Sequence, residues 1–191
     1  MKLEELQQQV AACTACPLHQ NRTHSVFSSG PPNSPLMIIG EGPGEQEDLT
    51  GFPFVGRAGE LLDKGLGEAE LSRDEVYVTN VVKCRPPGNR NPSRDEMLHC
   101  QDYLEDQIRI VKPKVIVLLG KVAAEFLLGR EVKITRENGQ VDAKHKGTPT
   151  MTVLHPAYVL RNQKPEVRQA FFEAIAKARD LAFGSSATPV A

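Results

Sequence analysis

Four short apolar runs, each followed by a segment with helical spacing, limit the folds open to this chain more than any other feature. The runs lie at residues 35–40, 76–79, 114–119 and 150–154, and the helical segments at about 57–68, 92–110, 120–128 and 165–183. Runs that are apolar throughout are typical of strands covered on both faces. Strands that alternate with helices form a parallel sheet between helix layers. The sequence therefore predicts an α/β protein, a three-layer α/β/α sandwich with a central four-stranded parallel sheet.

The remaining segments add little to this pattern. Leu3, Leu6 and Val10 have the spacing of a short helix, and residues 130–147 fit either a hairpin or an irregular excursion. With 191 residues, of which 40% are hydrophobic, the chain can bury one sizeable core. We expect a single domain over residues 1–183 and a flexible C-terminal tail over 184–191.

No segment has the character of a membrane span or an export signal. The longest apolar runs, such as residues 115–119, are far shorter than the roughly 20 residues that cross a bilayer. The N-terminus carries acids and glutamines where a signal peptide needs an apolar stretch. We expect a monomeric, cytoplasmic protein with no membrane partner.

Polar residues or glycines follow each predicted strand at the point where it ends. In strand order they are Gly40-Glu41-Gly42, Asn80, Gly120 and His155. The carboxyl ends of parallel strands meet at one edge of the sheet, and ligands of such folds bind beyond that edge. The sequence therefore predicts a site to which all four segments contribute.

The glycine-rich segment at residues 40–48 allows a close approach between backbone and ligand. It lacks the lysine and the Ser/Thr of a phosphate-binding loop, and its acids, Glu45, Glu47 and Asp48, would repel phosphate. A loop that lines a base or sugar pocket is more consistent with this composition. The alternative is a plain strand-to-helix turn with a solvated acidic rim.

Three side-chain types near these strand ends suit a nucleobase. Phe52 and Phe54 lie in a turn-rich segment that cannot easily bury both rings, and stacking of a base on such a ring contributes about 1–3 kcal/mol. Asn80 offers a donor and an acceptor for a base edge. His155 precedes a proline, so its backbone should be extended at the strand end. Each residue alone also fits a structural role, but the combination favours a base-binding site.

The chain has four cysteines: Cys13 and Cys16 in a Cys-x-x-Cys pair, then Cys84 and Cys100. Cytosolic chains rarely keep structural disulfides, so this number points toward a metal. The spacing fits either tetrahedral zinc or a [4Fe–4S] cluster, and four unrelated buried thiols are a third interpretation. A metal bound by all four would hold the opening helix against residues 84–100.

The net charge of −1 neither favours nor excludes nucleic acid, because a protein grips phosphates with a local basic surface. One candidate surface is formed by residues that are close in sequence, Lys83, Arg85, Arg90 and Arg94. The alternative is ordinary solvated surface charge.

Taken together, the motifs resemble those of the family 4 uracil-DNA glycosylases. They are the Cys-x-x-Cys start, GEGPGEQED, TGFPFVGRAG, TNVVKCRPPGNRNP, Cys100 and LHPAYVLR, in that order from Cys13 to Arg161. The resemblance implies a monofunctional base excision repair enzyme that hydrolyses the N-glycosidic bond of uracil in DNA. It also implies a [4Fe–4S] cluster bound by Cys13, Cys16, Cys84 and Cys100.

The resemblance implies roles for individual residues as well. Phe54 corresponds to the residue that stacks on the flipped uracil, Asn80 to the one that reads the base edge, and His155 to the donor to uracil O2. Residues 158–161 correspond to the loop that enters the duplex. We expect DNA contacts from this loop and from the basic segment, namely from Arg85, Arg90, Tyr158 and Arg161.

One position departs from other branches of the superfamily, which carry a water-activating Asp where this chain has Gly42. A glycine cannot act as a base, so Gly42 remains a substrate-binding position, and Glu41 or Glu47 could orient the water instead. Glu41 could also exclude the methyl group of thymine.

Two alternatives come from other classes of protein. One is a non-catalytic iron–sulfur module that binds nucleic acid, and the other is a zinc-stabilised hydrolase of free nucleotides.

Overall fold

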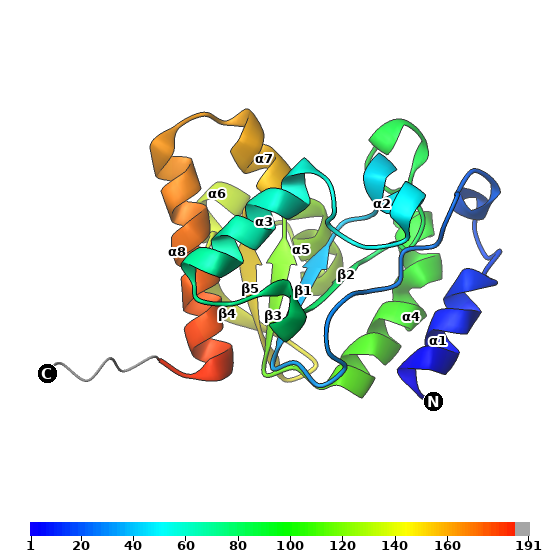
Figure 1. Ribbon diagram of the computed structural model, residues 1–191, viewed down its shortest axis with the longest axis horizontal. Helices are drawn as coiled ribbons and strands as arrows, with labels where there is room; N and C mark the ends of the chain where they lie inside the picture. Colours follow the sequence, from blue (N-terminus) through cyan, green and yellow to red (C-terminus); the bar gives the residue numbers. More distant parts are fainter. Residues whose placement is uncertain (186–191) are drawn as a thin grey trace, which may run out of the picture.

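The computed structural model describes residues 1–185 (Figure 1). Its centre is a sheet with the strand order β2-β1-β3-β5-β4. The strands are β1 (Leu36–Gly40), β2 (Tyr77–Asn80), β3 (Val115–Leu119), β4 (Gln140–His145) and β5 (Thr148–Val153). The four predicted strands run parallel to one another, while β4 pairs with β5 in the antiparallel direction. The three-layer α/β/α prediction is confirmed, but the predicted count of four strands is wrong, because the sheet has five.

Helices cover both faces of the sheet (Figure 1). One face packs against α3 (Arg57–Glu68), α7 (Pro156–Arg161) and α8 (Pro165–Phe183). The other packs against α4 (Arg94–Val111) and α5 (Lys121–Leu128), and α1 (Leu3–Ala11) lies outside on α4. The remaining short elements are α2 (Glu45–Thr50), α6 (Ile134–Glu137) and the 3₁₀ turns η1 (Pro17–Gln20), η2 (Arg73–Glu75) and η3 (Pro87–Asn89).

Strand β1 shows why continuous apolar runs form the centre of this fold. Successive side chains of a strand point to opposite faces. Leu36 and Ile38 accordingly join the core beneath α3 and α8, whereas Met37 and Ile39 join the core beneath α4 and α5. All five residues of β1 are buried, so a polar residue on either face would lie in a core.

Helix α4 begins with a capping box formed by Ser93 and Glu96. The Ser93 hydroxyl accepts a hydrogen bond from the Glu96 N–H (3.2 Å), and Glu96 Oε2 accepts one from the Ser93 N–H (2.8 Å). This reciprocal pair satisfies two N–H groups that a helix start leaves without partners. The cap fixes the start of the helix that carries Cys100.

The fifth strand, β4, escapes the sequence pattern because it lies at the edge of the sheet. Its sequence, QVDAKH, mixes polar and apolar residues, and its pairing with β5 shifts register between Gln140 and Ala143. The turn after it is held to α4 by Glu105, which contacts His145 (3.0 Å) and Lys146 (2.9 Å). At the opposite edge, Ser29 bridges to Val78 of β2 through two main-chain hydrogen bonds of 2.9 Å.

Helix α8 ends at Phe183, the last residue of the helix predicted from the sequence. Residues 186–191 of the predicted tail lie outside the described residues. Within residues 1–185, no helix combines the length and the apolar character needed to cross a membrane.

Candidate active site

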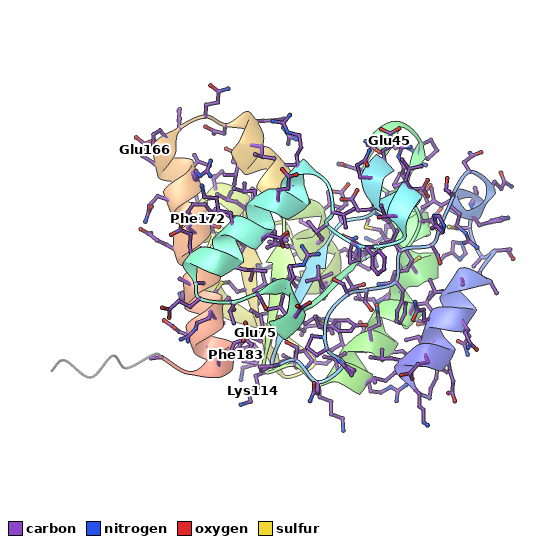
Figure 2. All side chains as sticks on the ribbon, in the orientation of Figure 1. Glu45, Glu75, Lys114, Glu166, Phe172 and Phe183 are labelled. Atoms are coloured by element: carbon purple, nitrogen blue, oxygen red, sulfur yellow. The ribbon has the colours of Figure 1, made fainter. Side chains whose placement is uncertain are left out.

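A cleft of about 630 Å³ opens at the carboxyl ends of β1, β2, β3 and β5. Figure 2 labels Glu45, which follows β1, at this edge of the molecule, and Glu75 and Lys114, which precede β2 and β3, at the opposite edge. The cleft brings together most of the site residues expected from the sequence. Its lining includes Glu41, Gly42, Glu47, Phe54, Asn80, Arg90, His155, Tyr158 and Arg161.

Asn80 lies at the end of β2, directly opposite Gly40 of β1. A Cβ atom on Gly40 would lie 2.5 Å from Asn80 Oδ1 and 2.5 Å from Phe54 Cζ, so the absent side chain is what lets these groups approach. Asn80 is 1% exposed, and its Oδ1 has no hydrogen-bond partner among the described residues. A buried acceptor without a donor is unfavourable unless a ligand supplies one.

Phe54 contributes a buried ring to the cleft, whereas Phe52 is 59% exposed and does not line it. The Phe54 ring centroid lies 6.0 Å from that of His155, and the two rings are tilted by 33°. Phe54 has a φ of +54°, a left-handed conformation that is rare for a bulky residue. The segment therefore holds the ring in place against a local conformational preference.

His155 caps helix α7, and its Nδ1 accepts a hydrogen bond from the Ala157 N–H (3.0 Å). A Cβ atom on the neighbouring Gly120 would lie 3.0 Å from His155 Cβ, so glycine leaves room for the ring. Burial lowers the pKa of His155 to about 4, and the positive charge of Arg161 adds to this effect. The ring is therefore neutral near pH 7, with its proton on Nε2, because Nδ1 acts as an acceptor.

The three acids of the glycine-rich segment differ in their surroundings. The segment is not all loop, because residues 45–50 form α2. Asp48 is buried, and its Oδ1 accepts hydrogen bonds from the N–H groups of Thr23 (2.9 Å) and His24 (3.4 Å). Asp48 is thus a link between α2 and the N-terminal segment, not a rim charge.

Glu41 and Glu47 both line the cleft. Burial raises the pKa of Glu41. Glu47 Oε1 accepts hydrogen bonds from the N–H groups of Val55 and Gly56, each at 3.3 Å, so this carboxylate also holds the segment that carries Phe54.

The basic residues expected to contact DNA do not all lie at the cleft. Arg90 lines it and forms an ion pair with Glu96 (2.6 Å), whereas Arg85 does not line it and donates to Asn89 (2.6 Å). Residues 158–161, expected as a loop, belong to α7.

Two further cations, Arg57 and Lys121, line the cleft and were not expected from the sequence. They are the first residues of α3 and α5, a position where the helix dipole disfavours positive charge. That unfavourable placement is the signal that could have marked them.

Lys83 is not part of a basic surface, and that prediction is wrong. Its side chain is 1% exposed, because it points inward from the end of β2. Its ammonium group donates to Thr79 Oγ1 (2.7 Å), the Asn80 carbonyl (2.6 Å) and Gln107 Oε1 (2.5 Å). Burial lowers the pKa of Lys83 to about 7, with negative charge at Cys100 opposing this effect.

All four cysteines line one small pocket beside α1 and α4, together with Arg22 and Lys83. No disulfide joins any of the four. Arg22 Nη1 lies 3.4 Å from Cys84 Sγ and 2.9 Å from the Cys13 carbonyl. In the described part of the chain, no group of three or more His, Cys, Asp or Glu side chains has the arrangement of a metal-ion site. The donor set nevertheless fits a thiolate-bound group, because four thiols line one pocket and the Arg22 guanidinium lies beside Cys84 Sγ, where a thiolate would carry negative charge.

The α/β sandwich thus places a ring, an amide and a neutral imidazole in one cleft. Comparisons with known proteins show the family. The family model described as the Uracil DNA glycosylase superfamily matches residues 27–178. A Type-4 uracil-DNA glycosylase of Thermotoga maritima is 46% identical over 180 residues, which cover 94% of this chain and 94% of that protein.

Two further proteins of the same name are similar as well. The protein of Sulfurisphaera tokodaii is 41% identical over 94% of this chain and 84% of its own length, and that of Archaeoglobus fulgidus is 38% identical over 88% and 87%. The chain therefore belongs to the uracil DNA glycosylase superfamily and, within it, to the Type-4 family.

Proposed function

We propose that this protein is a uracil-DNA glycosylase that hydrolyses the N-glycosidic bond of uracil in DNA. The observation that carries the proposal is the cleft itself, where Phe54, Asn80 and His155 meet at the ends of β1, β2 and β5. Membership of the family supports it, because the relatives compared are named for this activity. The same names do not favour a non-catalytic nucleic-acid-binding module.

The cleft offers a means of selecting uracil. Phe54 provides a face on which the extruded base can stack. Asn80 Oδ1, for which residues 1–185 supply no donor, can accept a hydrogen bond from uracil N3–H, while the amide NH₂ donates to O4. Cytosine presents the opposite pattern at both atoms. A mispaired amide costs about 1–3 kcal/mol, which favours uracil.

His155 is placed to stabilise the leaving group. When the bond between N1 and C1′ breaks, its electron pair leaves with uracil, and negative charge develops on O2. A neutral imidazole with its proton on Nε2 can donate to that oxygen, while water adds to C1′ and loses a proton. We assign the orientation of this water to Glu41 ahead of Glu47, because Glu47 Oε1 already accepts two main-chain hydrogen bonds.

The DNA backbone would pass over the rim of the cleft. Tyr158 and Arg161 of α7 would contact the strand near the gap that the extruded base leaves, and Arg90 would contact a phosphate at the rim. Arg85, which does not line the cleft, would contact a phosphate further along the strand. Gly42 would keep the floor of the cleft open to the base. We further propose that residues 1–183 form one domain, since a single continuous sheet lies at its centre, and that the protein acts as a cytoplasmic monomer.

The test is incubation of the purified protein with a uracil-containing oligonucleotide, followed by alkaline cleavage of abasic sites. We expect a cleaved product from the oligonucleotide that contains uracil and none when thymine or cytosine occupies the same position. Single-stranded and double-stranded substrates are assayed separately. Binding of the oligonucleotide without product would instead identify a non-catalytic module.

We also propose that Cys13, Cys16, Cys84 and Cys100 hold a [4Fe–4S] cluster. The support is their convergence on one pocket from three segments of the chain, with Arg22 and Lys83 beside them. The group would join α1 to the segment between β2 and α4, and its contribution would be structural.

If the cluster is present, the protein should be brown and should contain four iron atoms per chain. Its broad absorption, at roughly 400 nm, would come from thiolate-to-iron charge transfer. Changing Cys100 to serine should abolish the absorption and lower the thermal stability, because the helix that carries it loses its link to α1. Met97→Ala, on the same helix, is the matched control and should keep the colour. A colourless protein that contains one zinc ion would exclude the cluster.

A further inference from the structure

Phe54 is held in a conformation that it would not adopt on its own. Its φ is +54°, a region that bulky side chains avoid at a cost unless the surrounding structure imposes it. The ring is only 7% exposed, and it lies against Gly40 and beside His155. The groups that impose this conformation therefore decide whether the cleft has its stacking face.

Arg73, in the turn η2 between α3 and β2, is the first of these groups. Its Nη2 donates to the Pro53 carbonyl (2.7 Å) and its Nη1 to the Phe54 carbonyl (3.2 Å). Nη1 also pairs with Asp63 of α3 (3.1 Å). The guanidinium thus ties two successive carbonyls of the Phe54 segment to helix α3.

The Arg73 side chain is largely buried, and part of its guanidinium lies in an unfavourable environment. Its side chain is 21% exposed, and its Nε is buried without a hydrogen-bond partner among residues 1–185. A buried N–H without a partner is unfavourable. The hydrogen bonds to the two carbonyls, together with the ion pair to Asp63, offset this unfavourable burial.

Gly59 of α3 is the second group. A Cβ atom there would lie 1.8 Å from the Phe54 carbonyl oxygen and 2.2 Å from its carbonyl carbon. Only glycine lets the Phe54 carbonyl lie against the helix, within reach of Arg73. Glu47 holds the following residues, Val55 and Gly56, from the other side.

We propose that Arg73 is a positioning residue that keeps the Phe54 ring in the cleft before the base arrives. This inference rests on the proposed function, because it assigns Phe54 to stacking on the extruded uracil. Without the two carbonyl hydrogen bonds, Phe54 relaxes toward negative φ, and the ring leaves its place between Gly40 and His155. The base then meets a cleft without its stacking face.

The test is a double-mutant cycle on kcat/KM with a uracil-containing oligonucleotide. Arg73→Met should lower kcat/KM by about 10- to 100-fold in the wild-type background, because a strained conformation is released. In a Phe54→Ala background the same change should have less than about a twofold effect, because no ring remains to be positioned. Melting temperature and absorption near 400 nm show whether each variant is folded.

Two further variants make the experiment sharper. Arg73→Lys keeps the positive charge but not the planar fork that reaches two carbonyls, so it should recover little activity. Asp63→Asn, the matched control, loses the ion pair but keeps both carbonyl contacts, so its kcat/KM should remain within about threefold of wild type. If Arg73→Met does not fold, the cycle is run with Arg73→Lys.

An equal loss in both backgrounds, or full activity of folded Arg73→Met, would overturn the assignment of Arg73 while leaving the proposed function intact. An inactive wild-type protein would overturn both.

Discussion

Replacing His155 with alanine is expected to slow uracil excision on the order of 100-fold or more, because a preorganised donor to the leaving oxygen is lost. The imidazole is buried, neutral and fixed by its bond to the Ala157 N–H, so little reorganisation is needed during the reaction. Single-turnover rates on a uracil-containing oligonucleotide measure the effect. His155→Gln, which keeps an N–H donor, should be faster than His155→Ala; equal rates would argue against the donor role.

The low pKa of His155 adds a pH signature to this prediction. An unfolded chain protonates this histidine near its ordinary pKa of 6.5, whereas the folded protein does so only near pH 4. Between these values the unfolded state binds more protons, so stability falls as the pH is lowered from 6.5 toward 4. The loss from this residue is at most about 3 kcal/mol.

The matched comparison is His155→Gln, in which this part of the loss is absent. Denaturant unfolding of both proteins at pH 7 and pH 5 measures the difference. The wild-type rate of excision should also show no step near pH 6.5, because the ring remains neutral there. A rate that follows protonation near pH 6.5 would contradict a buried neutral histidine.

Replacing Asn80 with leucine is expected to separate activity from stability. Asn80 Oδ1 is buried without a donor among residues 1–185, so an apolar side chain of similar size removes an unfavourable group from the free protein. We expect the free energy of unfolding to stay the same or to rise by about 1 kcal/mol. Excision should fall by about 10- to 100-fold, because the base edge then meets no amide.

Thr79→Val is the matched control, one residue away on the same strand. The Thr79 hydroxyl donates to the Phe27 carbonyl (2.6 Å) and accepts from Lys83 (2.7 Å). Its removal should lower the free energy of unfolding by about 1–3 kcal/mol, because buried partners are left unpaired. Denaturant unfolding and kcat/KM for all three proteins test both statements. A marked destabilisation by Asn80→Leu would show that the amide serves the fold and not the ligand.

The strands and long helices could be predicted because their signals are local. Apolar runs marked β1, β2, β3 and β5, and helical spacing marked α3, α4, α5 and α8. Strand β4 could not be predicted in the same way, since an edge strand needs no continuous apolar run and its mixed sequence also fits a loop.

The cleft residues could be predicted because they lie at strand ends in the sequence. The residues that hold them in position could not be predicted in this way. Arg73 is 19 residues from Phe54, and only the folded chain brings its guanidinium to that carbonyl. Gly59 could have been noticed as a glycine inside a helical pattern, which often marks close packing. Lys83 was wrongly predicted to be exposed because lysine side chains are almost never fully buried. The three acceptors that make its burial possible, Thr79, Asn80 and Gln107, come together only in the folded chain.

The two margins of the sheet bear on how the protein behaves at high concentration. A long, flat strand with unpaired backbone groups invites another chain to add to it. Here Ser29 occupies part of the free hydrogen-bonding edge of β2. At the opposite edge of the sheet, β4 has a register shift and a sequence that mixes polar and apolar residues. Strand addition between copies, the usual first step of sheet-driven aggregation, therefore has no regular template on either side.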